Sequence, residues 1–197
     1  MRVIAGSAKG RRLFSVPGQS TRPITDRVKE ALFNILSDDV EGARFLDLFA
    51  GTGGVGIEAL SRGARHVTFV DSNRRAIATI HRNLEATQLV DGAEVVQRDA
   101  FRFIQEGGRE PYDIVYVAPP QYQGLWSRSL TALQGSSLVM PETLVVVQIY
   151  PKEFEPLELT QFVLSDQRTY GSTMLCFYVA RSQAPPDSEP QSHSHVG

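Results

Sequence analysis

A glycine-rich turn is the first feature of this sequence that could do chemistry. The segment FLDLFAGTGGVGIEAL runs from an apolar stretch through Gly51, Gly53, Gly54 and Gly56 into a helical pattern. Glycines permit positive φ angles and let a ligand approach the backbone closely, while free N–H groups at the start of a helix favour a carboxylate or a phosphate. Because Gly51-x-Gly53-x-x-Gly56 also matches the dinucleotide fingerprint, the motif predicts a cofactor site without choosing the cofactor.

Three acidic residues at the ends of apolar stretches narrow that choice. Asp71 follows the turn at the spacing of a ribose-binding acid. Asp47 precedes Gly51 and can receive the ammonium of an amino-acid ligand, a group that NAD lacks. Asp99 can accept a hydrogen bond from an adenine amino group. The pattern favours S-adenosylmethionine, and the predicted cofactor-binding residues from these segments are Asp47, Phe49, Gly51, Gly53, Gly56, Asp71, Ser72, Asp99, Ala100 and Phe101.

A proline pair marks a further strand end. Ala118-Pro119-Pro120 follows the apolar stretch DIVYV, and two prolines there form a rigid rim that has no evident role in hydride transfer. Ligands of open α/β sheets bind at the carboxyl ends of the strands, so the glycine turn, the acids and Pro119 should converge. Each acid taken alone could equally form a turn or cap a helix.

These residues need a sheet to position them. Apolar runs at 44–50, 66–72, 93–99, 113–119 and 143–149 predict strands, and helical spacing at 55–60 and 74–89 predicts helices between them. The runs at 162–171 and 172–181 predict a hairpin that adds an antiparallel edge. The expected fold is therefore α/β: a Rossmann-like, class I S-adenosylmethionine-dependent methyltransferase with a mostly parallel seven-stranded sheet and a C-terminal antiparallel hairpin.

The two ends of the chain differ from this central part. Thr25 can cap a helix whose apolar stripe is Val28, Leu32, Ile35 and Leu36. Residues 183–197 are polar and proline-rich, which predicts a disordered tail. We expect a basic N-terminal segment and helix over 1–40, a Rossmann-like domain over 41–182 and the tail over 183–197.

Composition excludes several classes of protein. A chain of 197 residues with 42% hydrophobic residues is expected to form one domain. It lacks an apolar run of the roughly 20 residues that span a bilayer and an apolar secretory signal, so we expect a cytoplasmic protein without a membrane partner. Cys176 suits a buried position, and His193 with His195 is too few ligands for a metal site. We expect a monomer without a metal.

Charge is distributed unevenly along the chain. Residues 1–29 hold seven Lys or Arg and one acid, although the whole chain has 20 Lys or Arg and 22 Asp or Glu. A basic end on an acidic body is typical of a surface that meets phosphates, and a plain solvated surface is the alternative. The predicted RNA-binding residues are Arg2, Lys9, Arg11, Arg12, Arg22 and Arg27.

The motifs resemble those of the RsmD family, bacterial methyltransferases that act on the exocyclic N2 of a guanine in small-subunit (16S) ribosomal RNA. The resemblance covers roughly residues 2–150 and is most specific at RVIAGSAKGRRL (2–13), TRPITDRVKEALFNIL (21–36) and DLFAGTGGVGIEALSRGA (47–64). It implies that residues 22–27, including Thr25, border the cofactor and the target base. It also implies that residues 2–12 bind ribosomal RNA or the small ribosomal subunit.

One motif departs from the family. Members carry Asp or Asn before the proline pair and an aromatic residue directly after it, where this chain has Ala118 and Gln121. Such enzymes accept the N–H bonds of a weakly nucleophilic amine with a side-chain oxygen and a backbone carbonyl, and Ala118 offers no such side chain. Tyr122 could stack on the base and Gln121 could supply an amide oxygen. The predicted catalytic residues are Ala118, Pro119, Pro120, Gln121 and Tyr122.

Three other readings stay open at this point. The chain could methylate a small-molecule or protein amine, although its basic N-terminus argues against that. It could be an NAD-binding dehydrogenase, because the glycine fingerprint is shared. It could also be a catalytically weak relative that binds RNA or assists ribosome assembly while retaining the cofactor pocket.

Overall fold

The architecture is a single sheet between two layers of helices. The computed structural model describes residues 1–18, 24–108 and 110–182. Their seven strands have the order β3-β2-β1-β4-β5-β7-β6. The strands are β1 (Arg44–Leu48), β2 (His66–Asp71), β3 (Ala93–Gln97), β4 (Ile114–Val117), β5 (Leu144–Ile149), β6 (Phe162–Tyr170) and β7 (Thr173–Ala180).

Sheet topology places the crevice. Strands β3, β2, β1, β4 and β5 are parallel neighbours, whereas β7 pairs antiparallel with both β5 and β6. All five predicted strands, the hairpin and the Rossmann-like fold class are confirmed. The chain order reverses at β1, whose two neighbours are β2 and β4. Ligands of such sheets bind beyond the carboxyl ends of the strands at this switch point.

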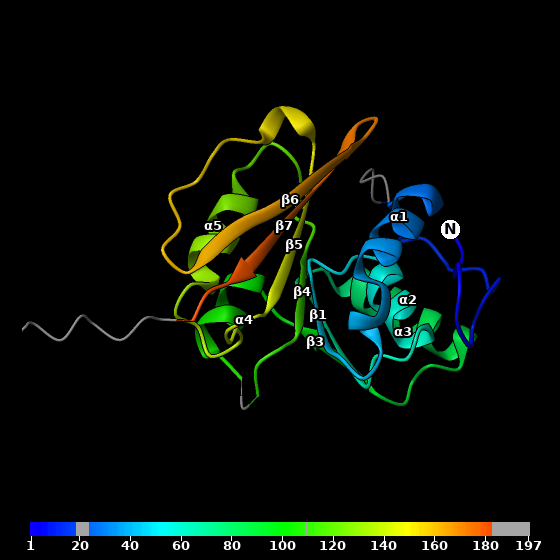
Figure 1. Ribbon diagram of the computed structural model, residues 1–197. Coiled ribbons are helices and arrows are strands. Elements are labelled where there is room, and N and C mark those ends of the chain that lie inside the picture. The colour runs from blue at the N-terminus through cyan, green and yellow to red at the C-terminus, as the bar shows by residue number, and fades with distance from the viewer. Residues whose placement is uncertain (19–23, 109, 183–197) are drawn as a thin grey trace, which may run out of the picture.

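Helices cover both faces of the sheet (Figure 1). One core cluster joins α1, α2 and α3 to one face, and the second joins α4 and α5 to the other. Alternate residues of each strand contribute to the two clusters, which is why the central strands are apolar throughout. The helices are α1 (Asp26–Leu36), η1 (Ser37–Val40), α2 (Gly54–Ser61), α3 (Arg74–Thr87), α4 (Ala100–Glu106), α5 (Leu125–Leu133) and η2 (Pro151–Glu153).

The first helix begins as predicted but turns a different face inward. Thr25 caps α1, because its Oγ1 accepts a hydrogen bond from the Val28 N–H at 3.3 Å. The buried face carries Phe33 in place of Ile35, which is exposed, so the predicted stripe is wrong at that position. The buried set is Val28, Lys29, Leu32, Phe33 and Leu36.

The N-terminal segment belongs to the same core as the sheet. Val3, Ala8 and Leu13 are buried in the cluster that contains α1 and α2. The predicted boundary at 40/41 therefore crosses a shared core, and the three-part division stays a prediction. The predicted tail, 183–197, and Arg22 lie outside the described residues.

The structure also bears on Cys176, on membrane-spanning helices and on clusters of metal-ligating side chains. Cys176 is fully buried in β7, as predicted. Among the described residues, no helix is long and apolar enough to cross a membrane. Within the same ranges, no three His, Cys, Asp or Glu side chains gather in a way that would hold a metal ion.

Candidate active site

A cleft lies at the carboxyl ends of the parallel strands. It consists of two adjoining cavities of about 250 and 780 Å³, which share Phe49, Gly51, Ala118 and Gln148 in their walls. The smaller cavity reaches Asp47, and the larger one reaches Asp71, Asp99 and the proline pair. The structure thus brings the glycine turn, the acids and Pro119 together as the topology predicts.

Asp47 forms the floor of the smaller cavity. Its side chain is buried, and Oδ2 accepts a hydrogen bond from the Gly56 N–H at 3.0 Å. Burial raises the pKa of Asp47 to about 8, because the single backbone hydrogen bond only partly offsets the lost hydration. A buried carboxyl with spare lone pairs, facing a cavity, suits an incoming ammonium group.

Asp71 shapes the glycine turn itself. Its Oδ2 accepts from the Gly51 N–H at 2.9 Å, and its Oδ1 accepts from the Asn73 N–H at 2.8 Å. Gly51 has a φ of 57°, a left-handed conformation that glycine adopts without strain. A carboxylate offers about four acceptor sites, so Asp71 keeps capacity for the two hydroxyls of a ribose.

The sequence left two roles open for Asp99, capping a helix or lining the cofactor site, and the structure shows that it does the first and also lines the cleft. It caps α4, with Oδ1 accepting from the N–H groups of Phe101 and Arg102, both at 3.1 Å. The residue also lines the larger cavity together with Ser72 and Ala100. Its Oδ2 takes no part in the cap and is available to a ligand in that cavity.

Several predicted cofactor residues act behind the cavity wall instead of in it. Gly56 is required by packing, because an added Cβ would stand 2.3 Å from the Phe69 ring. Gly53 caps α2 with a φ of 74°. Thr25 caps α1, and Phe101 packs edge-on against the cavity-lining Phe49 at 6.2 Å between ring centroids. None of the four residues Gly53, Gly56, Thr25 and Phe101 lines either cavity.

The predicted catalytic residues form the rim of the larger cavity. Ala118, Pro119, Pro120 and Gln121 line it, and Gln121 is exposed. Tyr122 projects into solvent with 66% of its surface exposed, beside the Tyr150 ring at 5.7 Å between centroids. The rim therefore carries an aromatic pair in which Tyr122 is exposed and Tyr150 is partly buried.

Sequence reasoning missed a polar pair at this rim. The Tyr116 hydroxyl donates to Gln148 Oε1 at 2.5 Å, and Gln148 lines both cavities. Burial raises the pKa of Tyr116 well above its ordinary value, so the hydroxyl stays protonated and keeps donating. The sequence signal was Gln148 itself, a polar residue within the apolar run of β5. Its contact with Tyr116 could not be predicted, because it depends on which strands are neighbours in the sheet.

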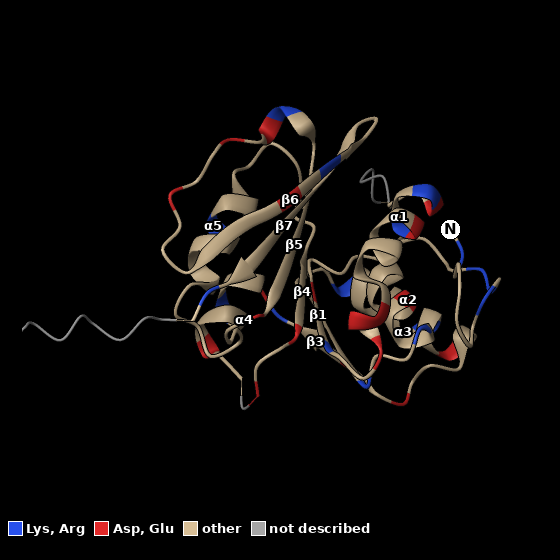
Figure 2. Ribbon diagram, viewed as in Figure 1, with Lys and Arg blue, Asp and Glu red and all other residues tan. Residues whose placement is uncertain are grey.

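The basic residues of the N-terminal segment are placed unequally. Lys9, Arg12 and Arg27 are exposed, and Figure 2 shows the segment's Lys and Arg beside the start of α1. Arg2 pairs with Asp26 at 3.2 Å. Arg11 donates to the carbonyl of Ala86 and to Gln88 Oε1 at the end of α3, so its guanidinium also holds the segment in place.

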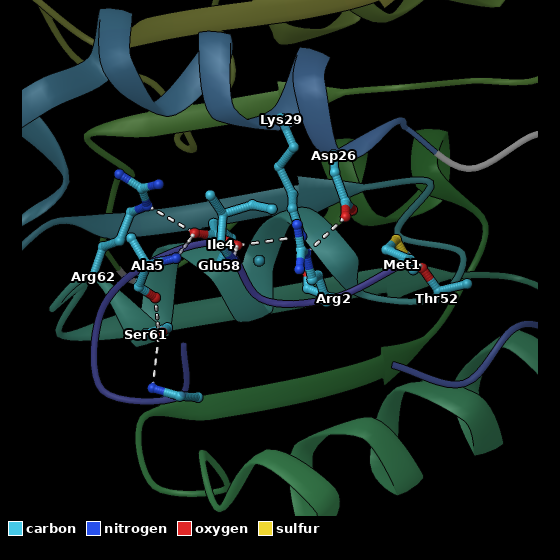
Figure 3. Close-up of polar contacts among 12 residues, drawn as sticks. Met1, Arg2, Ile4, Ala5, Asp26, Lys29, Thr52, Glu58, Ser61 and Arg62 are labelled. Atoms are coloured by element: carbon cyan, nitrogen blue, oxygen red, sulfur yellow. Dashed lines mark hydrogen bonds and ion pairs between the residues drawn. The ribbon is translucent and has the colours of Figure 1, made fainter. Parts of the chain in front are cut away.

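A buried ion pair fixes this segment against α2, the helix that follows the glycine turn (Figure 3). Lys29 of α1 and Glu58 of α2 are fully buried, with Lys29 Nζ 3.2 Å from Glu58 Oε2 and 2.6 Å from the Arg2 carbonyl. Burial lowers the pKa of Lys29, and Glu58 opposes that shift. Lys29 is one of the seven basic residues counted in 1–29, but because it is buried it does not contribute to an exposed basic surface.

The same helix satisfies the segment's backbone. Glu58 accepts from the N–H groups of Ile4 and Ala5 at 2.8 and 3.0 Å, and Ser61 Oγ accepts from Ala8. Because a buried unpaired N–H costs about 1–3 kcal/mol, these contacts hold the loop in one conformation. These contacts therefore make the basic segment part of the core that contains α2.

Fold and site together define the class of protein. A doubly wound sheet with a glycine turn after β1 and acids after β2 and β3, ending in an antiparallel hairpin, is the Rossmann-like class I methyltransferase arrangement. Known proteins make the assignment narrower. Residues 1–179 match the model of the family described as "Conserved hypothetical protein 95".

Individual relatives agree over nearly the whole chain. The "Putative rRNA methyltransferase YlbH" of Bacillus subtilis is 39% identical and covers 92% of this chain and 100% of the relative. The "Ribosomal RNA small subunit methyltransferase D" of Escherichia coli is 32% identical, over 96% and 94%. The solved "Putative methyltransferase yhhF" of Escherichia coli is 34% identical with a TM-score of 0.81, over 93% and 99%. The chain belongs to this family, the RsmD family of methyltransferases, as its motifs indicated.

Proposed function

We propose that this protein transfers a methyl group from S-adenosylmethionine to the exocyclic N2 of a guanine in small-subunit (16S) ribosomal RNA. The observation that carries the proposal is the continuous cleft in which Asp47, Asp71 and Asp99 stand in sequence and end at the proline rim. The printed names of the Bacillus subtilis and Escherichia coli relatives, both ribosomal RNA methyltransferases, support the substrate class.

The cleft fits the donor by charge and shape. S-adenosylmethionine, when bound, supplies an electrophilic methyl group on a sulfonium. In the proposed pose Asp47 ionises and binds the amino-acid ammonium, Asp71 accepts from the ribose hydroxyls, and Asp99 Oδ2 accepts from the adenine amine. Phe49 and Gly51, which line both cavities, lie between these contacts.

The RNA would approach over the basic N-terminal face. Lys9, Arg12 and Arg27 are exposed to phosphates. Phe14 is 39% exposed, carries the Arg82 guanidinium 3.5 Å from its ring centre, and directly precedes the cavity-lining residue Ser15. Exposed aromatic and guanidinium planes are the surfaces on which unstacked RNA bases rest. We propose free or assembled small-subunit RNA as the partner of a monomeric, cytoplasmic enzyme.

The target guanine leaves its stack and enters the slot beside the rim, where the protein positions its amine. The backbone carbonyl of Ala118 or of Pro119 accepts an N–H bond of the amine, which shifts electron density onto the nitrogen. Tyr122 stacks on the base from the outer side. Positioning of this kind converts the transfer into an effectively unimolecular step.

Mass spectrometry of small-subunit RNA from cells with and without the protein tests this proposal. We expect one guanine to lose a single N2-methyl group when the protein is absent. Purified protein with labelled S-adenosylmethionine should then restore the label at that nucleotide in RNA from the deficient cells. If both RNAs carry identical methylation and the protein binds the cofactor, the proposed function is wrong.

Ala118 favours one alternative, a catalytically weak relative that binds RNA. This second candidate predicts salt-sensitive RNA binding without label transfer, because binding rests on phosphate contacts. Single-turnover transfer measured with protein in excess over RNA separates the two. Wild type compared with Pro119→Ala shows whether the rim takes part in the reaction.

A further inference from the structure

We infer that Gln148 is a catalytic residue whose amide oxygen accepts an N–H bond of the target amine, the role for which Ala118 has no side-chain atom. This inference rests on the proposed function and names the group that completes it. Three observations carry it: the position of Gln148 beside Ala118, its exposure to both cavities, and the bond that fixes its amide.

Strand register puts the two residues side by side. Val117 of β4 pairs with Val147 of β5, so Ala118 and Gln148 are the next residues of two neighbouring parallel strands. Ala118 and Gln148 both line both cavities, and each is partly exposed to them. Ala118 has only a methyl side chain, so Gln148 is the residue of this pair that presents an amide to both cavities.

Tyr116 holds the amide in a productive orientation. Tyr116 is buried, and its hydroxyl donates to Gln148 Oε1. An amide oxygen has two lone pairs, so the oxygen that accepts from Tyr116 can accept one more hydrogen bond. Tyr116 is accordingly a positioning residue, and the unused lone pair is the acceptor for the substrate.

Gln121, the other amide near the rim, is less suited to this role. It is exposed and lines only the larger cavity, whereas Gln148 stands where the two cavities join. The methionine end of the donor enters the smaller cavity and its adenosine the larger one in the proposed pose. The reacting methyl therefore lies near the junction, on the side of Gln148.

The transfer step balances with these groups. The amine nitrogen forms a bond to the methyl carbon as the carbon–sulfur bond breaks, and the bonding pair goes to sulfur to give a neutral thioether. The Ala118 or Pro119 carbonyl and Gln148 Oε1 each hold one N–H while positive charge grows on the nitrogen. The amide is too weak a base to take the proton, which passes to water at the open mouth of the cleft.

Single-turnover methyl transfer is the first test, with the protein saturated in S-adenosylmethionine and the guanine located by mass spectrometry. Gln148→Leu should lower the rate constant by about 10²–10³, the usual effect of removing one preorganised hydrogen-bonding group. Gln105→Leu, which changes an exposed glutamine of α4 outside both cavities, is the matched control and should change it less than about fivefold. Adding Ala118→Asn to Gln148→Leu should recover most of the loss, since it returns an amide oxygen to the same wall.

Equilibrium binding gives a readout that does not depend on turnover. RNA with inosine at the target lacks the amine, so wild type with S-adenosylhomocysteine should bind it about fivefold more weakly than guanine RNA. Gln148→Leu should reduce this preference to about twofold, because a backbone carbonyl still accepts the other N–H, while keeping its affinity for inosine RNA and for cofactor. Tyr116→Phe, which preserves shape, should reduce the preference as well.

The possible results distinguish a failure of the role of Gln148 from a failure of the proposed methyltransferase function. Active wild type with an equally active Gln148→Leu, or an undiminished guanine preference in that variant, overturns the role of Gln148 and leaves the methyltransferase standing. Wild type that binds cofactor but labels no RNA overturns both. If Gln148→Leu loses its fold, the guanine preference of Tyr116→Phe decides, and an unchanged preference rejects the inference.

Discussion

The two ends of the cleft are built in different ways. The donor end comes from short continuous segments: β1 with its glycine turn, the end of β2 and the cap of α4, held by hydrogen bonds between neighbours such as Asp71 and Gly51. The acceptor end is assembled from β4, β5 and the turn between β6 and β7, which are distant in sequence. A local motif dictates the first end, and sheet order dictates the second.

The comparison teaches where a methyltransferase can vary. The acids and glycines of the donor end also serve the fold, because Asp99 caps a helix and Gly56 permits contact with Phe69. At the acceptor end Ala118 and Gln148 lie side by side on neighbouring strands and line one wall. A functional group can therefore move from one strand to the next there without disturbing the core.

Asp47→Asn should break the donor end alone and has the largest expected effect. We expect the cofactor Kd to rise by about 100-fold, since the ammonium loses its buried counter-charge. RNA affinity should stay the same. The free protein should melt at or above the wild-type temperature at pH 7, because burial raises the pKa of Asp47 to about 8 and the wild type must take up a proton there on folding, whereas the amide is neutral in both states. Calorimetry measures the binding, and the exposed Asp91→Asn is the control; a Kd within fivefold of wild type would contradict the assignment.

Gly56→Ala tests whether the donor end doubles as core. The added Cβ would stand 2.3 Å from a Phe69 ring atom, so we expect a loss of about 1–3 kcal/mol in the free energy of unfolding. In Gly54→Ala the new Cβ meets the flexible end of Met1 and should cost much less. Denaturant unfolding of the pair measures the difference. Equal stability of the two variants would show that helix α2 is free to shift.

Tyr122→Ala should affect the acceptor end only. Loss of a stacking surface is expected to weaken binding of the target RNA about tenfold while the cofactor Kd is unchanged. Tyr122→Phe retains the ring and serves as the control, with affinity close to wild type. Fluorescence anisotropy with labelled RNA measures the effect. Equal RNA affinity for Tyr122→Ala and wild type would remove the ring from the proposed base slot.

The pH dependence of cofactor binding should be the smallest of these effects, and it tests the donor end through Asp47. Because ammonium binding requires Asp47 to ionise and burial raises its pKa to about 8, affinity should rise about five- to tenfold from pH 7 to pH 8.5. The stability of the protein without cofactor should change in the opposite direction. Because the folded-state pKa of Asp47 is raised, its contribution to the free energy of unfolding is fully present below about pH 4 and is lost as the pH rises through about 8. Asp47→Asn should show neither slope in calorimetry and thermal melts. A wild-type affinity that falls over this range would contradict the prediction.

Much of the fold was readable from the sequence. Buried parallel strands are continuous apolar runs, so all five were found, and Tyr170-Gly171 marked the turn of the hairpin. The N-cap of α1 was readable at Thr25 because the capping bond is local. Its inward face was not, because Phe33 and Lys29 are buried by partners that lie far away in sequence.

The site residues likewise divide into those that local sequence predicted and those that depend on long-range contacts. The three acids were predicted from their positions at strand ends, and the structure places all three on the cleft. Gln148 was missed because its neighbour Ala118 is 30 positions away and only strand pairing brings them together. Glu58 was missed because a buried carboxylate inside a helix has no sequence signature apart from its unusual apolar surroundings.

A crystal structure of the protein with S-adenosylhomocysteine tests the central claim most directly. The account predicts the ammonium at Asp47, the ribose hydroxyls at Asp71, the purine amine at Asp99, and the sulfur facing the wall formed by Ala118 and Gln148. A cleft that excludes the ligand at saturating concentration, or a ligand whose sulfur points away from that wall, would contradict it.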